Sequence, residues 1–246
     1  MSEKSKSKID ESVNFDGVEW GYDLYPERKQ PRKINFINWF FKMQSRDNIE
    51  QYKCEKKVVA VIKTSPLVKI MKSALERAGC PINYRRHIQC EFCESLVTGG
   101  YDPIQNQIVI CQNSCRSENM IHSVLIHEMI HMFDFCVREM DFKNIDHLAC
   151  SEIRAANLTY CSYLSAFFGK HIDRSKIKEQ QPECVKRRAA DSVYAVRPVS
   201  REEADAAVER VFNKCYNDLE PIGRRISKAS YSYDLAYSEA FLMGYD

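Results

Sequence analysis

The segment with the clearest chemical capacity is His127-Glu128-Met129-Ile130-His131. On an α-helix, side chains four residues apart project from one face about one turn apart, so both imidazoles can reach one metal ion. Glu128, next to the first histidine, can take a proton from a metal-bound water, whose pKa zinc lowers to about 7. The pattern predicts a zinc metallopeptidase with His127 and His131 as ligands and Glu128 as catalytic base.

A pattern with three fixed positions also occurs by chance, as a polar stripe on an ordinary helix. Here the surrounding residues are strongly apolar, and burying two histidines and a glutamate without a metal or partners would be costly. The metal interpretation is therefore favoured. His122 lies five residues before His127, which is poor spacing for a ligand, so we interpret it as a surface or supporting residue.

A peptidase zinc needs a third protein ligand and keeps its fourth position for water. Two candidates follow on the next predicted helix, His147 and Glu152. They are five residues apart, about 140° around an ideal helix, so only one should bind. The affinity of imidazole for zinc favours His147. Depth in the helix favours Glu152, which we predict as the ligand, with His147 as the alternative.

Two charged residues nearby have open roles. Asp134 lies on the same helical face as His131 and could accept a hydrogen bond from a ligand's outer ring nitrogen, or be a solvated acid paired with Arg138. Arg154 could pair with Asp134 or Asp141, or stabilise an oxyanion. The sequence does not separate these alternatives.

Two helices are predicted to position the site. Ser117 is a favourable N-cap and Glu118 suits the first turn of a long helix that carries the His-Glu-x-x-His segment. The polar segment 140–145 can reverse the chain, so that a second helix, about 144–168, packs antiparallel to the first.

The remaining pattern predicts further elements. Apolar residues at helical spacing indicate a helix over 58–78, closed by Gly79 and Pro81. Short strands at 94–98 and 107–111, joined by a GGYDPIQN turn, and a helix near 201–216 complete the set. We expect a helix-rich α+β fold of the zincin type, with a small sheet packed on the active-site helix. Strand 107–111 is predicted as its edge, where an extended substrate could add as a strand.

Composition limits the function classes. With 36 basic and 34 acidic residues in 246, the net charge of +2 gives no argument for a nucleic-acid partner. The leader is neither a signal nor a transit peptide, and 121–137 is too short and too interrupted by polar residues to span a bilayer. We predict an arm (1–45), a metallopeptidase domain (46–220) and a tail (221–246). Within the arm, NFINWFFKM (35–43) either packs on the domain or anchors to a membrane or partner.

Together, HEMIHMFDFC, GGYDP, IVICQN and HLACSEIRAANL make the chain resemble the mitochondrial inner-membrane metallopeptidase family that processes a precursor subunit of ATP synthase and assists its assembly. The likeness runs from about Cys80 to Asp218. It implies zinc at His127 and His131, catalysis by Glu128, and peripheral association with the inner membrane on its intermembrane-space side. The N-terminal arm lies outside the shared pattern.

The eleven cysteines have two interpretations. Cys90 and Cys93, followed by Cys111 and Cys115, have the layout of a four-thiolate structural zinc site. An oxidising compartment instead favours disulfides, which we prefer, although no pairing can be deduced from the spacing. The odd total leaves at least one thiol unpaired, and Cys54, outside the family pattern, is the predicted one.

The sequence thus favours a peptidase acting on an ATP synthase subunit precursor. The alternative is a non-proteolytic assembly factor that uses the zinc domain as a binding module. A third hypothesis, a nuclear partner in DNA repair, would use the basic run 186–188, and the near-neutral charge and the cysteines argue against it.

Overall fold

The computed structural model describes residues 46–93, 97–161 and 177–223. The predicted arm (1–45) and most of the predicted tail (224–246) lie outside these residues, as does the NFINWFFKM segment. The described elements are α3 (Arg46–Thr64), α4 (Pro66–Arg77), α5 (Tyr84–His87), β1 (Ile88–Glu91), β2 (Gly99–Asp102), β3 (Gln107–Cys111), α6 (Glu118–Arg138), α7 (Ile145–Ala155), the π-helix η2 (Ala156–Tyr160), α9 (Ile177–Val196) and α10 (Arg201–Tyr216). The fold is α+β and rich in helices, as the sequence predicts.

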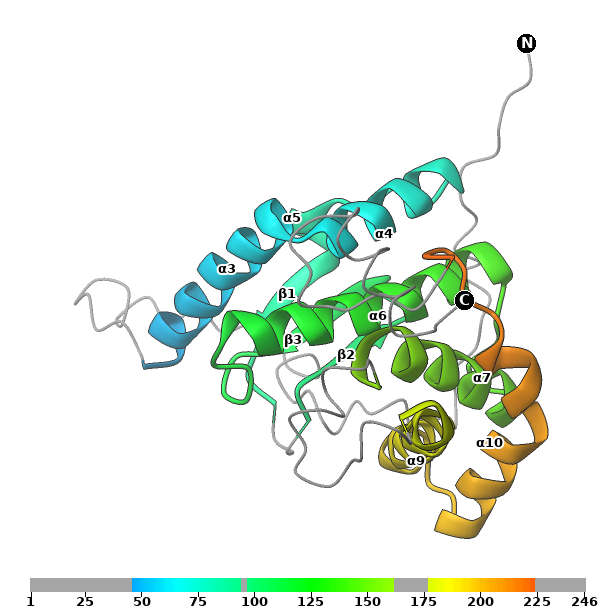
Figure 1. The fold of residues 1–246 in the computed structure, drawn as a ribbon. Helices are drawn as coiled ribbons and strands as arrows, with labels where there is room; N and C mark the ends of the chain where they lie inside the picture. The colour runs from blue at the N-terminus through cyan, green and yellow to red at the C-terminus, as the bar shows by residue number, and fades with distance from the viewer. Residues whose placement is uncertain (1–45, 94–96, 162–176, 224–246) are drawn as a thin grey trace.

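Helix α6 lies at the centre of the fold, between two groups of elements (Figure 1). It begins where the sequence predicts, because the Ser117 side chain accepts a hydrogen bond from the Met120 backbone N–H and Glu118 lies in the first turn. By length and composition α6 could span a membrane, but 72% of its apolar window is buried inside the fold. We therefore interpret it as the core helix of a folded domain.

The small sheet has the strand order β1-β3-β2. Strand β3 pairs with β1 in parallel and with β2 in antiparallel orientation. The bounds predicted for β3 are confirmed, but its predicted place at the edge is wrong, because a strand with four buried residues in five is paired on both sides. The two edge strands are β1 and β2. Strand β2 is formed by GGYD, which the sequence pattern predicts as part of a turn.

The glycines of β2 explain that error. Glycine is a turn signal in sequence, but it also allows close approach of backbone to another element. A Cβ on Gly99 would lie 2.4 Å from the Val124 side chain of α6 and 2.6 Å from the Val109 carbonyl oxygen. Gly99 therefore lets the edge strand lie tightly against the helix that carries the candidate site.

The helix predicted over 58–78 is two helices. Pro66 lacks a backbone N–H and occupies the first turn of α4, while the Ser65 side chain caps that helix by accepting from the Val68 N–H. Downstream, α10 is confirmed. Helix α9 is not among the predicted elements, and it contains Pro182. The predicted 144–168 helix is α7 followed by η2 as far as Tyr160, and residues 162–168 lie outside the described ones.

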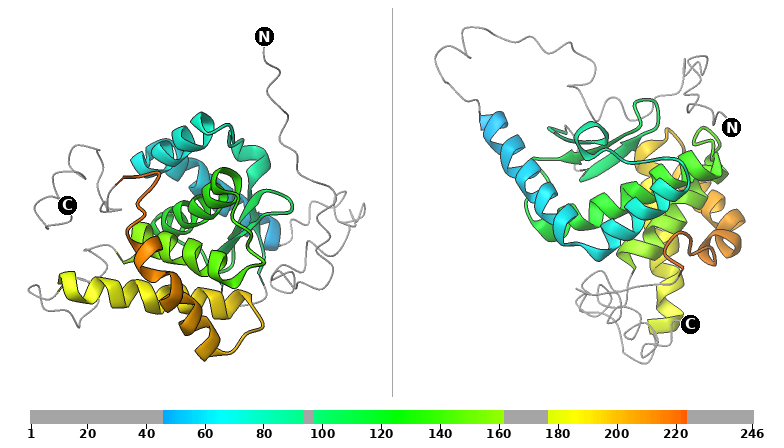
Figure 2. Two further views of the ribbon diagram at one scale, coloured as in Figure 1. Left: turned by 90° about the vertical axis from the view of Figure 1, so that its right-hand side faces the viewer. Right: turned by 90° about the horizontal axis from the view of Figure 1, so that it is seen from above.

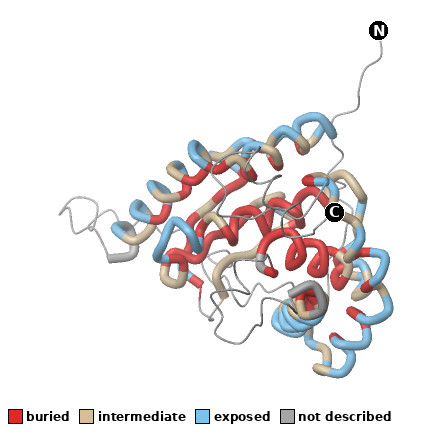
Figure 3. The backbone as a smooth tube through the Cα atoms, in the orientation of Figure 1, coloured by how far each residue is buried: buried red, intermediate tan, exposed pale blue. Residues whose placement is uncertain are grey.

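Two hydrophobic cores meet at the central helices. One joins α3, α4, the sheet and α6, and the other joins α7, α9 and α10. Figure 3 shows α6 and α7 as mostly buried, whereas the outer faces of α9 and α10 are exposed. In Figure 2, α9 and α10 lie on the side of α7 away from α3. Polar groups between α6 and α7 are thus shielded by both cores.

Ten of the eleven cysteines are disulfide-bonded, as the preferred interpretation predicts. The pairs are Cys54–Cys90, Cys80–Cys136, Cys93–Cys111, Cys150–Cys215 and Cys161–Cys184. The prediction that Cys54 is unpaired is wrong, because α3 lies beside β1 and brings it to Cys90. The free thiol is the buried Cys115. A four-thiolate zinc site at Cys90, Cys93, Cys111 and Cys115 is contradicted, since three of these sulfurs are in disulfides.

Candidate metal centre

Helix α6 brings the three residues of the His-Glu-x-x-His pattern together inside the fold. The Nε2 atoms of His127 and His131 lie 3.1 Å apart. The candidate ligand atoms of His127, Glu128 and His131 all lie within 4.8 Å of one another, and all three residues are buried. The local geometry is that of residues four apart on one helical face, facing one point.

Glu152 reaches the same point from α7. Its Oε2 lies 3.4 Å from His127 Nε2, and its Oε1 lies 3.5 Å from His131 Nε2. Four ligands at zinc's usual 2.0–2.1 Å stand about 3.3–3.4 Å apart at the corners of a tetrahedron. The two imidazoles and the Glu152 carboxylate, which turns one oxygen toward each histidine, are therefore separated by distances close to those between ligands of a tetrahedral zinc ion. Oε2 also has no hydrogen bond of good geometry among the described residues, as expected of an atom suited to a cation.

His147 lies elsewhere. It is exposed in the first turn of α7, where its Nδ1 accepts a hydrogen bond from the Asp141 backbone N–H at 3.1 Å. His122 is also away from the centre, and its Nε2 lies 2.7 Å from the Ser65 hydroxyl, so it joins α6 to α4. Of the two candidates for a third ligand, the structure places Glu152 beside the histidines.

The electrostatics of the centre follow from burial. Burial lowers the pKa of His131 to about 4, so its imidazole is neutral near pH 7. Burial also acts against charge on His127, but the carboxylates of Glu152 and Glu128 outweigh it and raise the pKa of His127. Burial acts to raise the pKa of Glu152, but the nearby His131 and His127 together outweigh burial, so the net effect is a lowered pKa. Without metal, Glu152 is therefore the anion of the group.

Glu128 has the pKa of a general base. Burial raises the pKa of Glu128 to about 7, against the nearby His127 and a backbone hydrogen bond from Tyr101, both of which lower it. A base is most effective when its pKa lies near the working pH. The Tyr101 N–H belongs to the edge strand β2, so the candidate base lies directly beside the strand edge.

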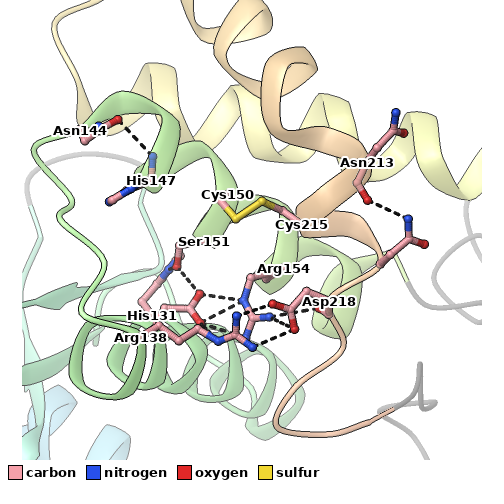
Figure 4. Close-up of a disulfide and its surroundings, with 12 residues drawn as sticks. His131, Arg138, Asn144, His147, Cys150, Ser151, Arg154, Asn213, Cys215 and Asp218 are labelled. Atoms are coloured by element: carbon pink, nitrogen blue, oxygen red, sulfur yellow. Dashed lines mark hydrogen bonds and ion pairs between the residues drawn. A yellow bond between two sulfur atoms is a disulfide. The ribbon is translucent and has the colours of Figure 1, made fainter.

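Buried polar side chains also lie at the Nδ1 edge of the His131 ring, away from the metal centre (Figure 4). His131 Nδ1 lies 2.7 Å from the Ser151 hydroxyl, which donates to Asp134 Oδ2 at 2.8 Å. Arg154 donates to both oxygens of Asp134. Burial raises the pKa of Asp134, and the Arg154 guanidinium and its hydrogen bonds oppose that rise. Of the open sequence alternatives, pairing of Arg154 with Asp134 is the one observed.

Helix α9 supplies groups that sequence reasoning did not find. The Ser192 side chain hydrogen-bonds to Glu152 and helps to lower its pKa. Arg188, one turn earlier on α9, is exposed yet close enough to lower the pKa of His127. The i, i+4 spacing of Arg188 and Ser192 was visible in the sequence, but nothing there indicated which helix they face.

Comparison with known proteins agrees with this site. The family model of the peptidase M76 family matches residues 52–223. The "Mitochondrial inner membrane protease ATP23 homolog" of Danio rerio is 40% identical over 209 residues, covering 83% of this chain and 78% of the relative. The Homo sapiens protein of the same name is 40% identical over 206 residues, covering 82% and 79%. The "Mitochondrial inner membrane protease atp23" of Schizosaccharomyces pombe is 39% identical over 174 residues, covering 70% and 92%.

No solved structure matches the chain. The family match nevertheless spans more than half of the sequence and includes every residue of the candidate centre. The chain belongs to the peptidase M76 family and is a metallopeptidase.

Proposed function

We propose that the chain is a zinc endopeptidase of the zincin type, with His127, His131 and Glu152 as metal ligands and Glu128 as the base. The observation that carries this proposal is the spacing of 3.1–3.5 Å between three buried donor groups on two helices. Residues 46–220 form the catalytic domain in this proposal, supported by the extent of the family match.

The residues have separate tasks in the reaction. Zinc, when bound, polarises the scissile carbonyl and makes water more acidic. Glu128 takes the proton of the attacking water and returns it to the leaving amine. The edge of β2 offers backbone groups to which an extended peptide can add as a strand, next to Glu128. Because burial raises the pKa of Glu128, a larger fraction of its carboxyl group is protonated than in water, and a bound cation would lower that fraction.

The test is Glu128→Gln in the full chain. The variant should keep its fold and bound zinc but lose cleavage by about 10²–10⁴-fold, the usual contribution of general acid–base catalysis. Glu118→Gln, in the first turn of the same helix, is the matched control and should cleave normally. Unchanged cleavage by Glu128→Gln would exclude the mechanism.

We further propose that the substrate is a precursor subunit of ATP synthase, and that the protein assists assembly of the synthase membrane sector. Support comes from the sequence resemblance and from relatives named as mitochondrial inner membrane proteases. Five disulfides favour an oxidising compartment, which agrees with peripheral association on the intermembrane-space side.

Complementation separates proteolysis from assembly. In cells that lack the endogenous protein, Glu128→Gln should leave the precursor uncleaved. If ATP synthase still assembles, the domain also acts as a binding module. If the precursor is still processed when the wild-type chain is absent, this substrate assignment is wrong.

A further inference from the structure

A chain of buried hydrogen bonds runs from His131 away from the metal centre. It passes through the Ser151 hydroxyl to Asp134 and then to Arg154, with distances of 2.7, 2.8 and 2.9–3.1 Å. Asp134, Ser151 and Arg154 are each 0% exposed. Such a run of polar groups in a core is costly unless every member is paired.

The hydrogen bonds determine the position of one proton. Arg154 stays charged and places N–H donors against both oxygens of Asp134, and the Arg138 guanidinium lies 3.9 Å from the same carboxylate. These two cations hold Asp134 ionised against its burial, so its oxygens only accept. A serine hydroxyl has one proton to donate, and Ser151 donates it to Asp134. Ser151 therefore accepts from His131, whose proton must be on Nδ1.

This tautomer has a consequence at the other ring nitrogen. With the proton on Nδ1, the lone pair of His131 is on Nε2, the atom that faces His127 Nε2 at 3.1 Å and Glu152 Oε1 at 3.5 Å. The opposite tautomer would point an N–H at the position a metal ion would occupy. Supporting hydrogen bonds of this kind commonly contribute 10- to 100-fold in metal affinity.

We propose that Ser151 and Asp134 are positioning residues that hold His131 as its Nδ1–H tautomer, ready to bind a divalent metal. The inference rests on the metallopeptidase function proposed above. It differs from direct carboxylate support of a ligand, because the hydroxyl of Ser151 lies between the two groups and sets the direction of both hydrogen bonds.

Arg154 anchors this chain to a distant segment. Its Nη2 donates to the Glu220 carbonyl oxygen at 2.7 Å, and its Nη1 donates to the Asp218 carbonyl oxygen at 3.2 Å. Arg138 of α6 pairs with the carboxylates of Asp218 and Glu220. The segment after α10 thus contacts Arg154 through the backbone of residues 218 and 220 and through the Asp218 carboxylate (Figure 4).

Asp134→Asn is the sharpest test, because it keeps the shape but can reverse the direction of the bonds. The amide oxygen would face Arg154, and its NH₂ would donate to Ser151, whose proton would then point at His131 Nδ1. Ser151→Ala removes the link without forcing either tautomer, and Ser151→Thr restores a hydroxyl. Ser123→Ala is the matched control, a buried serine on α6 that donates to the Asn119 carbonyl.

The measurement is Zn²⁺ affinity of the full, oxidised chain by competition with a chromogenic chelator, together with the ¹⁵N-detected tautomer of His131 in metal-free protein. Asp134→Asn should lower the affinity about 10- to 100-fold and move the proton to Nε2. Ser151→Ala should lose less, and Ser151→Thr should recover part of it. Ser123→Ala should match wild type.

The outcomes are separable from those for the proposed function. If wild type binds Zn²⁺ and both Ser151→Ala and Asp134→Asn keep its affinity and tautomer, the network is only structural and the inference fails. Should Asp134→Asn not fold, unchanged affinity of Ser151→Ala overturns the inference by itself. Failure of wild type to bind Zn²⁺ would reject the proposed function instead.

Discussion

The two ends of helix α7 carry similar side chains in opposite surroundings. In its first turn, His147 is exposed, and Asp146 pairs with Arg210 of α10, with side chains 38% and 50% exposed. Less than two turns further on, Ser151, Glu152 and Arg154 are buried between α6 and the helices behind it. Residue type alone does not distinguish the two ends, because each carries an acidic residue, a possible metal ligand and a residue that forms an ion pair.

Depth against α6 separates them. Water solvates the groups of the first turn, so their hydrogen bonds contribute little. At the buried end the same groups have no water and must be paired with one another or with a cation. Substitutions at the two ends should therefore have unequal effects, and comparing them tests the assignment of roles.

The largest difference should follow removal of the two candidate ligands. Glu152→Ala should lose zinc on dialysis and lose cleavage by roughly 10³-fold or more, as expected when several kcal/mol of metal assistance disappear. His147→Ala should keep its zinc, because its ring is turned to the Asp141 backbone. Metal content by mass spectrometry checks both. Zinc loss in His147→Ala alone would reverse the assignment.

The buried ion pair should show the next largest effect, on stability. Arg154→Met leaves the Asp134 charge without its main partner in the core and should cost about 3–5 kcal/mol of unfolding free energy. Urea unfolding of the metal-free, oxidised chain measures it. A cost below about 1 kcal/mol would show that Arg138 or water replaces the guanidinium.

The disulfide from the middle of α7 should contribute less to the free energy of unfolding. Cys150 lies next to Ser151 and is bonded to Cys215 of α10, 65 residues away in sequence (Figure 4). Replacing both with serine should cost about 2–4 kcal/mol while Zn²⁺ is still bound. The same change at Cys93 and Cys111, 18 residues apart, should cost about 1 kcal/mol less by loop entropy. An equal or greater cost there would argue against that explanation.

The smallest effect is expected at the exposed end. Arg210→Met breaks the Asp146 pair, but solvent and salt already screen it. Its unfolding midpoint should equal that of wild type within error at 0.15 M salt. Arg154→Met measured in parallel is the contrast. A similar loss in both variants would mean that depth along α7 does not control these pairs.

Several features could be predicted from local sequence. The Ser117 cap, the bounds of α10 and the strand at 107–111 depend on residues that are neighbours in sequence. The errors came where a residue has two local meanings. Proline can begin a helix, as at Pro66, or lie within its early turns, as at Pro182, and the Gly99-Gly100 pair formed an edge strand instead of a turn.

His127 and His131 share a helical face, with Glu128 between them in sequence, because the helical repeat sets the direction of side chains within one helix. Local sequence was therefore enough to predict this part of the site. Three contacts between elements could not be predicted in this way. Glu152 and not His147 lies beside the histidines, Ser151 lies between His131 and Asp134, and Cys54 is bonded to Cys90. These contacts depend on the register in which one helix or strand packs along another. That register is set by packing of whole apolar faces and by loop geometry, which no short motif contains.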